Sequence, residues 1–203
     1  MRKIILIYLL SGFSGSVFSG DRFILARFHG FEGKDLKDLF KERSLVPSDL
    51  KGIGVVKIYE IGHSVDKKIF SQVLKDFNCK NKIQNQKDLK IIIWGYSWGA
   101  RNTYEFSKMF QKTCGRKADI GYLVDGIQKP ISQFRRAPIA KYCKNYYKTI
   151  YPLRGRPVDD CQNIDLTDTC KLPDGGHLKG FQCHQAVLHE GNGMVMEDLK
   201  KRN

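Results

Sequence analysis

The chain has 203 residues, enough for one domain with a sizeable core but few for two, so a single domain is expected. It carries 35 lysine and arginine residues against 21 aspartate and glutamate residues, which gives a formal net charge of +14. Such an excess attracts anionic polymers or membrane surfaces. The basic residues are spread along the chain and are not interleaved with aromatic residues, so a specific nucleic-acid-binding surface is not expected.

The first 19 residues have the pattern of a secretory signal peptide. Arg2 and Lys3 form a basic start, an apolar run covers 4–10, and small residues lie near Ser19. The segment is too short and too rich in glycine and serine for a membrane-spanning helix. We therefore predict a secreted or periplasmic protein with a single mature domain, residues 20–203, that has no transmembrane segment and can contact the cell envelope peripherally. The alternative interpretation is a buried first strand.

Apolar β-branched runs alternate along the chain with segments of helical period. The predicted strands span 23–28, 55–61, 89–94, 120–124 and 146–151. The predicted helices span 35–43, 66–77, 100–113, 131–142 and 193–200, and the stretch 152–180 is the one long irregular segment. This alternation predicts an α/β fold: a doubly wound, mostly parallel sheet of about five to six strands with helices on both faces.

Six cysteines, an even number, suit a disulfide framework in an exported chain. No two have the close spacing of a zinc ribbon or a dithiol redox site, so neither a metal nor a redox centre is expected. Cys161 and Cys170 are near enough to pair across one loop. For the other four, we expect Cys79 to pair with Cys114 and Cys143 with Cys183, although spacing alone does not fix the connectivity.

The segment Gly95-Tyr96-Ser97-Trp98-Gly99-Ala100 has the form of a nucleophile elbow. An apolar run ending at Trp94 leads into it, and a segment of helical period starts at Ala100. A serine on such a turn needs small neighbours, which Gly95 and Gly99 provide. The hydroxyl of Ser97 would then project above the carboxyl edge of the sheet, so Ser97 is the predicted nucleophile.

A serine nucleophile requires a base that is oriented by a carboxylate. Asp125 ends the predicted strand 120–124 and would emerge at the same sheet edge as Ser97. It is the predicted acid, with the role of an ordinary turn residue as the alternative. Asp159, Asp160 and Asp165 compete with it because they follow the next strand.

The order serine, aspartate, histidine along the chain places the base near the C-terminus. His184 is the predicted base because it follows Cys183, which a disulfide can hold in place, and precedes an apolar stretch. His189 and His177 are the alternatives.

Acyl transfer also needs two backbone donors for the oxyanion. The amide of Trp98 would supply one of them, and the amide of Phe31 the other, since Gly30 permits close backbone approach. His29 and His63 lie at strand ends and are expected to line the site with Gly30 and Tyr96. The alternative for both histidines is a hydrogen bond to the backbone.

These segments resemble small secreted bacterial lipase and esterase-like proteins of the α/β-hydrolase superfamily. The resemblance implies hydrolysis of a carboxylic ester or lipid through an acyl-enzyme, without metal or cofactor, and the basic surface favours an anionic substrate. In lipases of pancreatic type the acid follows the strand after the nucleophile, and Asp125 matches that position.

Cutinases are a second resemblance, and they would place the acid at Asp165, between Cys161 and Cys170. Two departures from the lipase pattern stand out: there is no amphipathic lid insertion, and Gly126-Ile127 follows Asp125 where proline is common. One fold also hosts proteins without activity, so a non-catalytic hydrolase-like module that binds an anionic envelope polymer is the alternative function.

Overall fold

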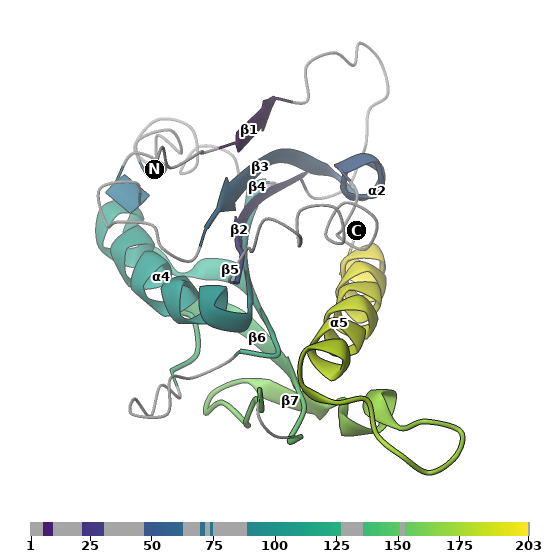
Figure 1. The fold of residues 1–203 in the computed structure, drawn as a ribbon. Coiled ribbons are helices and arrows are strands. Elements are labelled where there is room, and N and C mark those ends of the chain that lie inside the picture. Colours follow the sequence, from purple (N-terminus) through teal and green to yellow (C-terminus); the bar gives the residue numbers. More distant parts are fainter. Residues whose placement is uncertain are drawn as a thin grey trace.

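The structure, a computed structural model, describes residues 6–9, 22–30, 47–62, 70–71, 74, 89–126, 136–150 and 153–202. These residues form a seven-stranded sheet in the order β1-β3-β2-β4-β5-β6-β7 (Figure 1). The strands are β1 Leu6–Leu9, β2 Arg22–Phe28, β3 Val55–Ile61, β4 Leu89–Tyr96, β5 Ala118–Val124, β6 Ala140–Tyr147 and β7 Gln162–Asp165. Strands β2 to β7 are parallel, and β1 pairs with β3 in the antiparallel direction.

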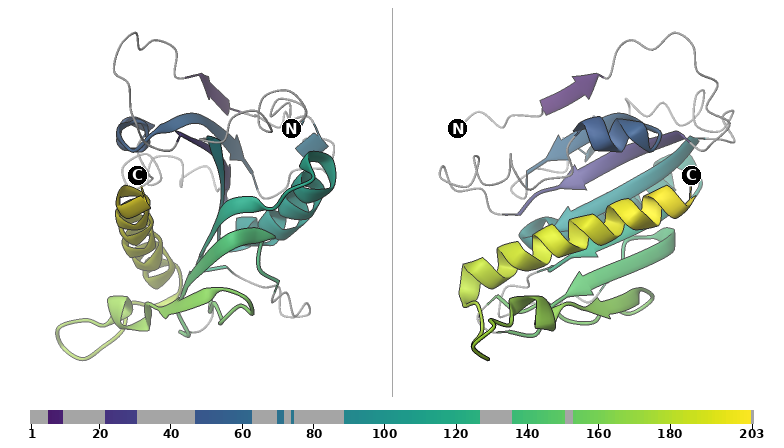
Figure 2. Two further views of the ribbon diagram at one scale, coloured as in Figure 1. Left: turned by 180° about the vertical axis from the view of Figure 1, so that it is seen from behind. Right: turned by 90° about the vertical axis from the view of Figure 1, so that its right-hand side faces the viewer.

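Helices cover both faces of the sheet. Helix α4 (Ala100–Cys114) packs on one face, and α5 (Gly180–Arg202) with the short α2 (Pro47–Gly52) packs on the other (Figures 1 and 2). Strand β4 contributes alternate residues to the two apolar layers, because successive side chains of a strand point to opposite faces. Both layers are therefore built on the strand that leads into Ser97, and the predicted doubly wound α/β class is confirmed.

Strand β6 corrects two of the predicted elements. It begins at Ala140 and ends at Tyr147, and residues 136–139 before it are not helical. The predicted helix 131–142 is therefore wrong over its described part, 136–142, and the predicted strand 146–151 starts too late. Lysines interrupt the apolar pattern of this strand, but each is matched by a carboxylate: Lys141 pairs with Asp119 and Lys144 pairs with Asp198. These ion pairs join residues that are distant in sequence, so the local sequence does not reveal them.

The irregular stretch predicted over 152–180 contains strand β7 and the 3-10 helix η3 (Thr167–Cys170). Most of β7 is exposed, and this polar edge strand lacks the apolar run by which strands are found. The last helix starts at Gly180, thirteen residues before the predicted start at Gly193. Gly191 breaks the sequence pattern there, yet it lets the helix approach the sheet, since a Cβ atom would lie 2.9 Å from Val124.

The disulfides differ from the predicted pairing. Cys143 is bonded to Cys161 and Cys170 is bonded to Cys183, so both Cys143–Cys183 and Cys161–Cys170 were wrong. Residue 161 directly precedes β7, which pairs with β6, and this register brings Cys161 beside Cys143. Cys114 is also disulfide-bonded, but its predicted partner Cys79 lies outside the described residues.

Strand β1 lies within the predicted signal peptide and pairs along the edge of β3. Removal of residues 1–19 would leave β3 as the edge strand, and cleavage stays a prediction. The predicted helix 35–43 lies outside the described residues, and the predicted helix 66–77 is described, and helical, only at 70, 71 and 74. None of the described helices has both the length and the apolar character that crossing a membrane requires.

The Cys170–Cys183 bond closes a short loop, with a sequence separation of 13, and joins η3 to the first turn of α5. Replacing both cysteines with serine is expected to lower the free energy of unfolding by about 3 kcal/mol, because the unfolded chain regains the freedom that the loop restricts. Urea unfolding measures this loss. The double variant Cys143→Ser/Cys161→Ser, which opens a loop with a sequence separation of 18, is expected to lose a similar amount. An unchanged stability of the Cys170/Cys183 variant would contradict the assignment.

Candidate active site

Ser97 lies where β4 passes into α4, in a backbone conformation that serine rarely adopts. Its φ angle is 55°, and its residue surface is 5 % exposed. A positive φ at a residue with a side chain carries strain, which persists only where the surroundings hold it. Gly95 helps to hold it: a Cβ atom there would lie 2.4 Å from the side chain of Thr103 and 2.8 Å from the backbone of Ala100. The strand-to-helix turn predicted from the sequence is thus present.

The end of β2 packs directly on this turn. A Cβ atom at Gly30 would lie 2.5 Å from Cβ and 2.9 Å from Oγ of Ser97. A Cβ atom at Gly99 would lie 2.3 Å from the carbonyl oxygen of Phe28. Two glycines are therefore required for the close approach of the two backbones, and one of them, Gly30, borders Ser97.

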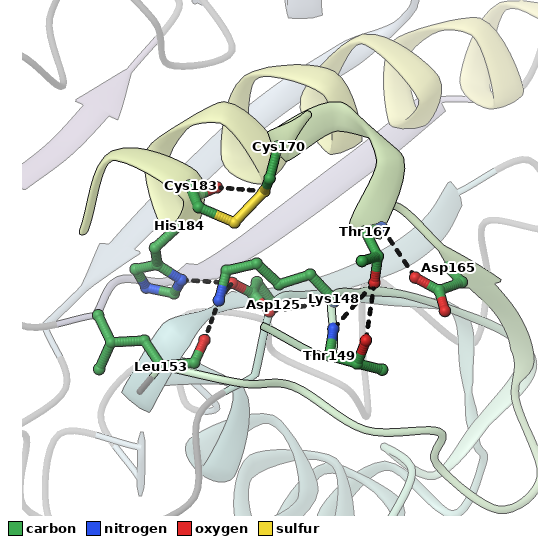
Figure 3. The surroundings of a disulfide bond; sticks show 9 residues. All are labelled: Asp125, Lys148, Thr149, Leu153, Asp165, Thr167, Cys170, Cys183 and His184. Atoms are coloured by element: carbon green, nitrogen blue, oxygen red, sulfur yellow. Dashed lines mark hydrogen bonds and ion pairs between the residues drawn. A yellow bond between two sulfur atoms is a disulfide. The ribbon is translucent and has the colours of Figure 1, made fainter. Parts of the chain in front are cut away.

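His184 and Asp125 form a buried hydrogen-bonded pair. Nδ1 of His184 lies 2.5 Å from Oδ2 of Asp125, and the two side chains are 2 % and 0 % exposed (Figure 3). A carboxylate can only accept, so Nδ1–H donates, and in the neutral imidazole Nε2 carries the lone pair. Asp125 follows β5 directly, has a φ angle of 41°, and is fixed to the next strand by its amide, which donates to the carbonyl oxygen of Tyr146.

Tyr96 joins this pair to the predicted nucleophile. Its ring stacks on the imidazole of His184 with a centroid separation of 4.7 Å and an interplanar angle of 22°, and Ser97 is the next residue of the chain. Burial raises the pKa of the Tyr96 hydroxyl well above its ordinary value, and the negative charge of Asp125 raises it further. Tyr96 therefore contacts the histidine as a neutral ring.

Within the described part of the chain no direct hydrogen bond joins Ser97 to His184. Hydrogen bonds of this kind are often long in unliganded sites and tighten in the complex with substrate. Ser97 directly follows β4, and His184 lies near the start of α5. The disulfide at Cys183 holds this end of the helix against η3 (Figure 3).

Two aromatic side chains are exposed beside the site. Trp98, directly after Ser97, is 37 % exposed, and Phe181, whose ring centroid lies 6.3 Å from that of His184, is 41 % exposed. Exposed rings of this size provide apolar surface near the buried polar groups.

Lys148 is a site residue that sequence reasoning missed. Its ammonium group lies 3.1 Å from Oδ2 of Asp125, and both side chains are fully buried. It also donates to the carbonyl oxygen of Leu153 (Figure 3). Lysine is rarely buried, and nothing in the sequence around it marks this lysine as internal.

The side chain of His29 contacts a carboxylate on the neighbouring strand. Its Nε2 contacts Glu60, which also accepts hydrogen bonds from the guanidinium of Arg27 at 2.8 and 2.5 Å. Burial by itself would raise the pKa of Glu60, but the charge of Arg27 and the contact with His29 lower it to about 2. Glu60 is thus ionised, and Nε2–H of His29 donates to it.

Three of the alternative residues are exposed, in contrast to the buried His184–Asp125 pair. His189 is exposed. It lies five residues after His184 on α5, so the two side chains point to different faces of the helix. His177 is exposed in the loop before α5, and Asp165 is exposed and accepts a hydrogen bond from the amide of Thr167.

Two predicted site residues, Phe31 and His63, lie outside the described residues. Among the residues that the structure describes, no group of three or more histidine, cysteine, aspartate or glutamate side chains is placed to hold a metal ion.

No protein-family model and no curated protein matches the chain. Similar solved structures include a "predicted CIB-like hydrolase" from Thermoplasma acidophilum, with 13% identity, a TM-score of 0.50, and coverage of 92% of this chain and 89% of that one. A Xanthomonas campestris protein named for the alpha/beta superfamily of hydrolases has 13% identity, a TM-score of 0.45 and coverage of 86% and 98%. A cutinase-like protein from Cryptococcus sp. has 9% identity, a TM-score of 0.42 and coverage of 90% and 97%.

The chain therefore has an α/β fold like that of the Thermoplasma acidophilum structure, with disulfides that fasten β7 and α5 to their neighbours. Identities of this size carry the fold alone, so the chemistry of the chain has to be argued from its own residues.

The contact between Gly30 and Ser97 leaves no room for a methyl group. Gly30→Ala is expected to displace the serine hydroxyl and to lower its rate of reaction with a fluorophosphonate by more than about tenfold, because a misplacement of one ångström suffices for such losses. Gly193→Ala is the matched control, since a Cβ atom there meets nothing within 4 Å. Equal rates for the two variants would show that Gly30 does not shape the site.

Proposed function

We propose that the protein is a secreted serine hydrolase that cleaves carboxylic esters through an acyl-enzyme on Ser97. The observation that carries this proposal is the buried hydrogen bond between His184 and Asp125, beside a serine held at positive φ. An imidazole that is oriented by a carboxylate can activate a serine as a nucleophile, and here the serine lies on a strained turn at the same sheet edge. The apolar rings of Trp98 and Phe181 fit an acyl or other apolar substituent of the substrate.

In this mechanism Oγ of Ser97 attacks the ester carbonyl carbon while its proton passes to Nε2 of His184. Asp125 holds the imidazole in the tautomer with a free Nε2 and stabilises the imidazolium that forms. The tetrahedral intermediate then collapses: the bond to the leaving oxygen breaks, and His184 returns the proton to the leaving alcohol. Water, activated by the same imidazole, hydrolyses the acyl-serine.

The amide of Trp98, in the single 3-10 turn Ser97–Gly99 that leads into α4, is the first proposed oxyanion donor, and the amide of Phe31, after Gly30, is the second. The N-terminal end of a helix favours a developing negative charge. The positive charge of the whole chain favours an anionic ester or an ester at an anionic envelope surface. Disulfides suit an oxidising compartment, and we propose export with residues 20–203 as the mature domain.

Labelling with a fluorophosphonate probe tests the nucleophile. The folded wild-type protein is expected to take up the probe, and Ser97→Ala is expected to take up none, because the probe reacts only with an activated serine. The alternative, a non-catalytic module that binds an anionic polymer, predicts no uptake by the folded wild type. That result would overturn the proposed function.

Paired variants test the acid and the base. Asp125→Asn is expected to reduce kcat for a p-nitrophenyl ester by about 10³- to 10⁴-fold, because the asparagine favours the wrong tautomer of the histidine. Asp165→Asn is the control for the acid and should retain wild-type activity, since Asp165 is exposed in a turn. His184→Gln should be as inactive as Asp125→Asn, whereas His189→Gln should stay active; the reverse pattern would assign the base to His189.

A further inference from the structure

Lys148 is the least expected side chain near Ser97, because burial of an ammonium group is costly unless it is paired. It directly follows β6, and its side chain is fully buried, as is that of Asp125. The pairing is extensive: Nζ contacts both Oδ2 of Asp125 and the carbonyl oxygen of Leu153, while the backbone amide of Lys148 lies 3.4 Å from Oδ1 of Asp125.

Oδ2 of Asp125 is shared by two donors from different parts of the fold. His184 approaches it from α5 at 2.5 Å, and Lys148 approaches it from the end of β6 at 3.1 Å. Oδ1 is enclosed from the other side, since a Cβ atom at Gly155 would lie 2.8 Å from it. Both oxygens of the carboxylate therefore lie against protein groups, and the ammonium group of Lys148 balances its negative charge.

We propose that Lys148 is a positioning residue that keeps His184 in its neutral, proton-accepting form. Where a histidine is the only partner of a buried carboxylate that can carry a positive charge, the carboxylate favours the protonated imidazolium. The net charge of the pair is then zero. With Lys148 present, the carboxylate already has its counter-charge. His184 can donate Nδ1–H to Asp125 and leave Nε2 free, as the proposed function, on which this inference rests, requires.

The other titratable groups of the surrounding elements add little charge. From β4, Tyr96 stacks on the imidazole, but burial and the charge of Asp125 keep its hydroxyl neutral. From η3 and the first turn of α5 come the bonded sulfurs of Cys170 and Cys183, which do not titrate. Among these described contacts, Lys148 is the cation of the site, and its charge acts on His184 through the shared Oδ2 of Asp125.

NMR of protein with isotope-labelled histidine reads the charge of His184 directly as pH varies. The His184 signal, one of five histidines, is assigned by its loss in His184→Gln. In Lys148→Met the midpoint of the His184 titration is expected to rise by at least about one pH unit, the effect of removing a buried charge a few ångströms away. Lys148→Gln, which keeps polar contacts but not the charge, is expected to shift it in the same direction.

Lys144→Met is the matched control, because Lys144 lies on β6, the strand that Lys148 follows, and forms its ion pair with Asp198 at 2.7 Å instead of with Asp125. It should leave the His184 midpoint unchanged. An unchanged midpoint in folded Lys148→Met overturns the inference, and if that variant does not fold, Lys148→Gln decides in the same way. The NMR measurement does not depend on enzyme activity. If the wild type takes up no fluorophosphonate, the proposed function is refuted, but the titration still decides the role of Lys148.

Discussion

The hydrogen bond between Asp125 and His184 is the interaction on which the arrangement at the sheet edge depends. It joins the carboxyl end of β5 to the first turn of α5, two elements whose bonded residues are 59 positions apart in sequence. Both side chains are buried, so the bond needs support from its surroundings. That support comes from the Cys170–Cys183 disulfide on the helix side, from the ring of Tyr96, and from Lys148 on the strand side.

A second constraint acts on Ser97 and comes from backbone packing. Parallel strands bring their carboxyl ends to one edge, so the ends of β2, β4 and β5 meet there. The strained turn at Ser97 is held by close contact with the end of β2, which only glycine at positions 30 and 99 allows. The sheet thus sets the relative positions of the serine and the carboxylate. Helix α5, which covers one face of the sheet, adds the histidine.

Much of this arrangement could be predicted from local sequence signals. The apolar run before Gly95 and the helical period after Ala100 indicated the turn at Ser97, and the position of Asp125 at the end of a strand indicated its place at the same edge. His184 was identified from chain order and from its neighbour Cys183, although the helix that carries it begins thirteen residues earlier than its pattern predicted.

The features that were not predicted depend on contacts between distant segments. Lys148 has no local signature of burial, because its partners Asp125 and Leu153 are brought to it by the fold. The disulfide pairing follows from the register of β6 with β7, a polar edge strand that hydrophobic patterning does not detect. The same holds for His29, whose partner Glu60 lies on the neighbouring strand.

The claim that Ser97 is the nucleophile is tested most directly by mass-spectrometric mapping of a phosphonate adduct, because mapping identifies which residue is modified. After treatment of the folded wild type and digestion with trypsin, the adduct is predicted on the peptide of residues 91–101, at Ser97, and to be absent when the protein is treated in urea. An adduct at another serine, or equal modification of folded and unfolded protein, would contradict the account.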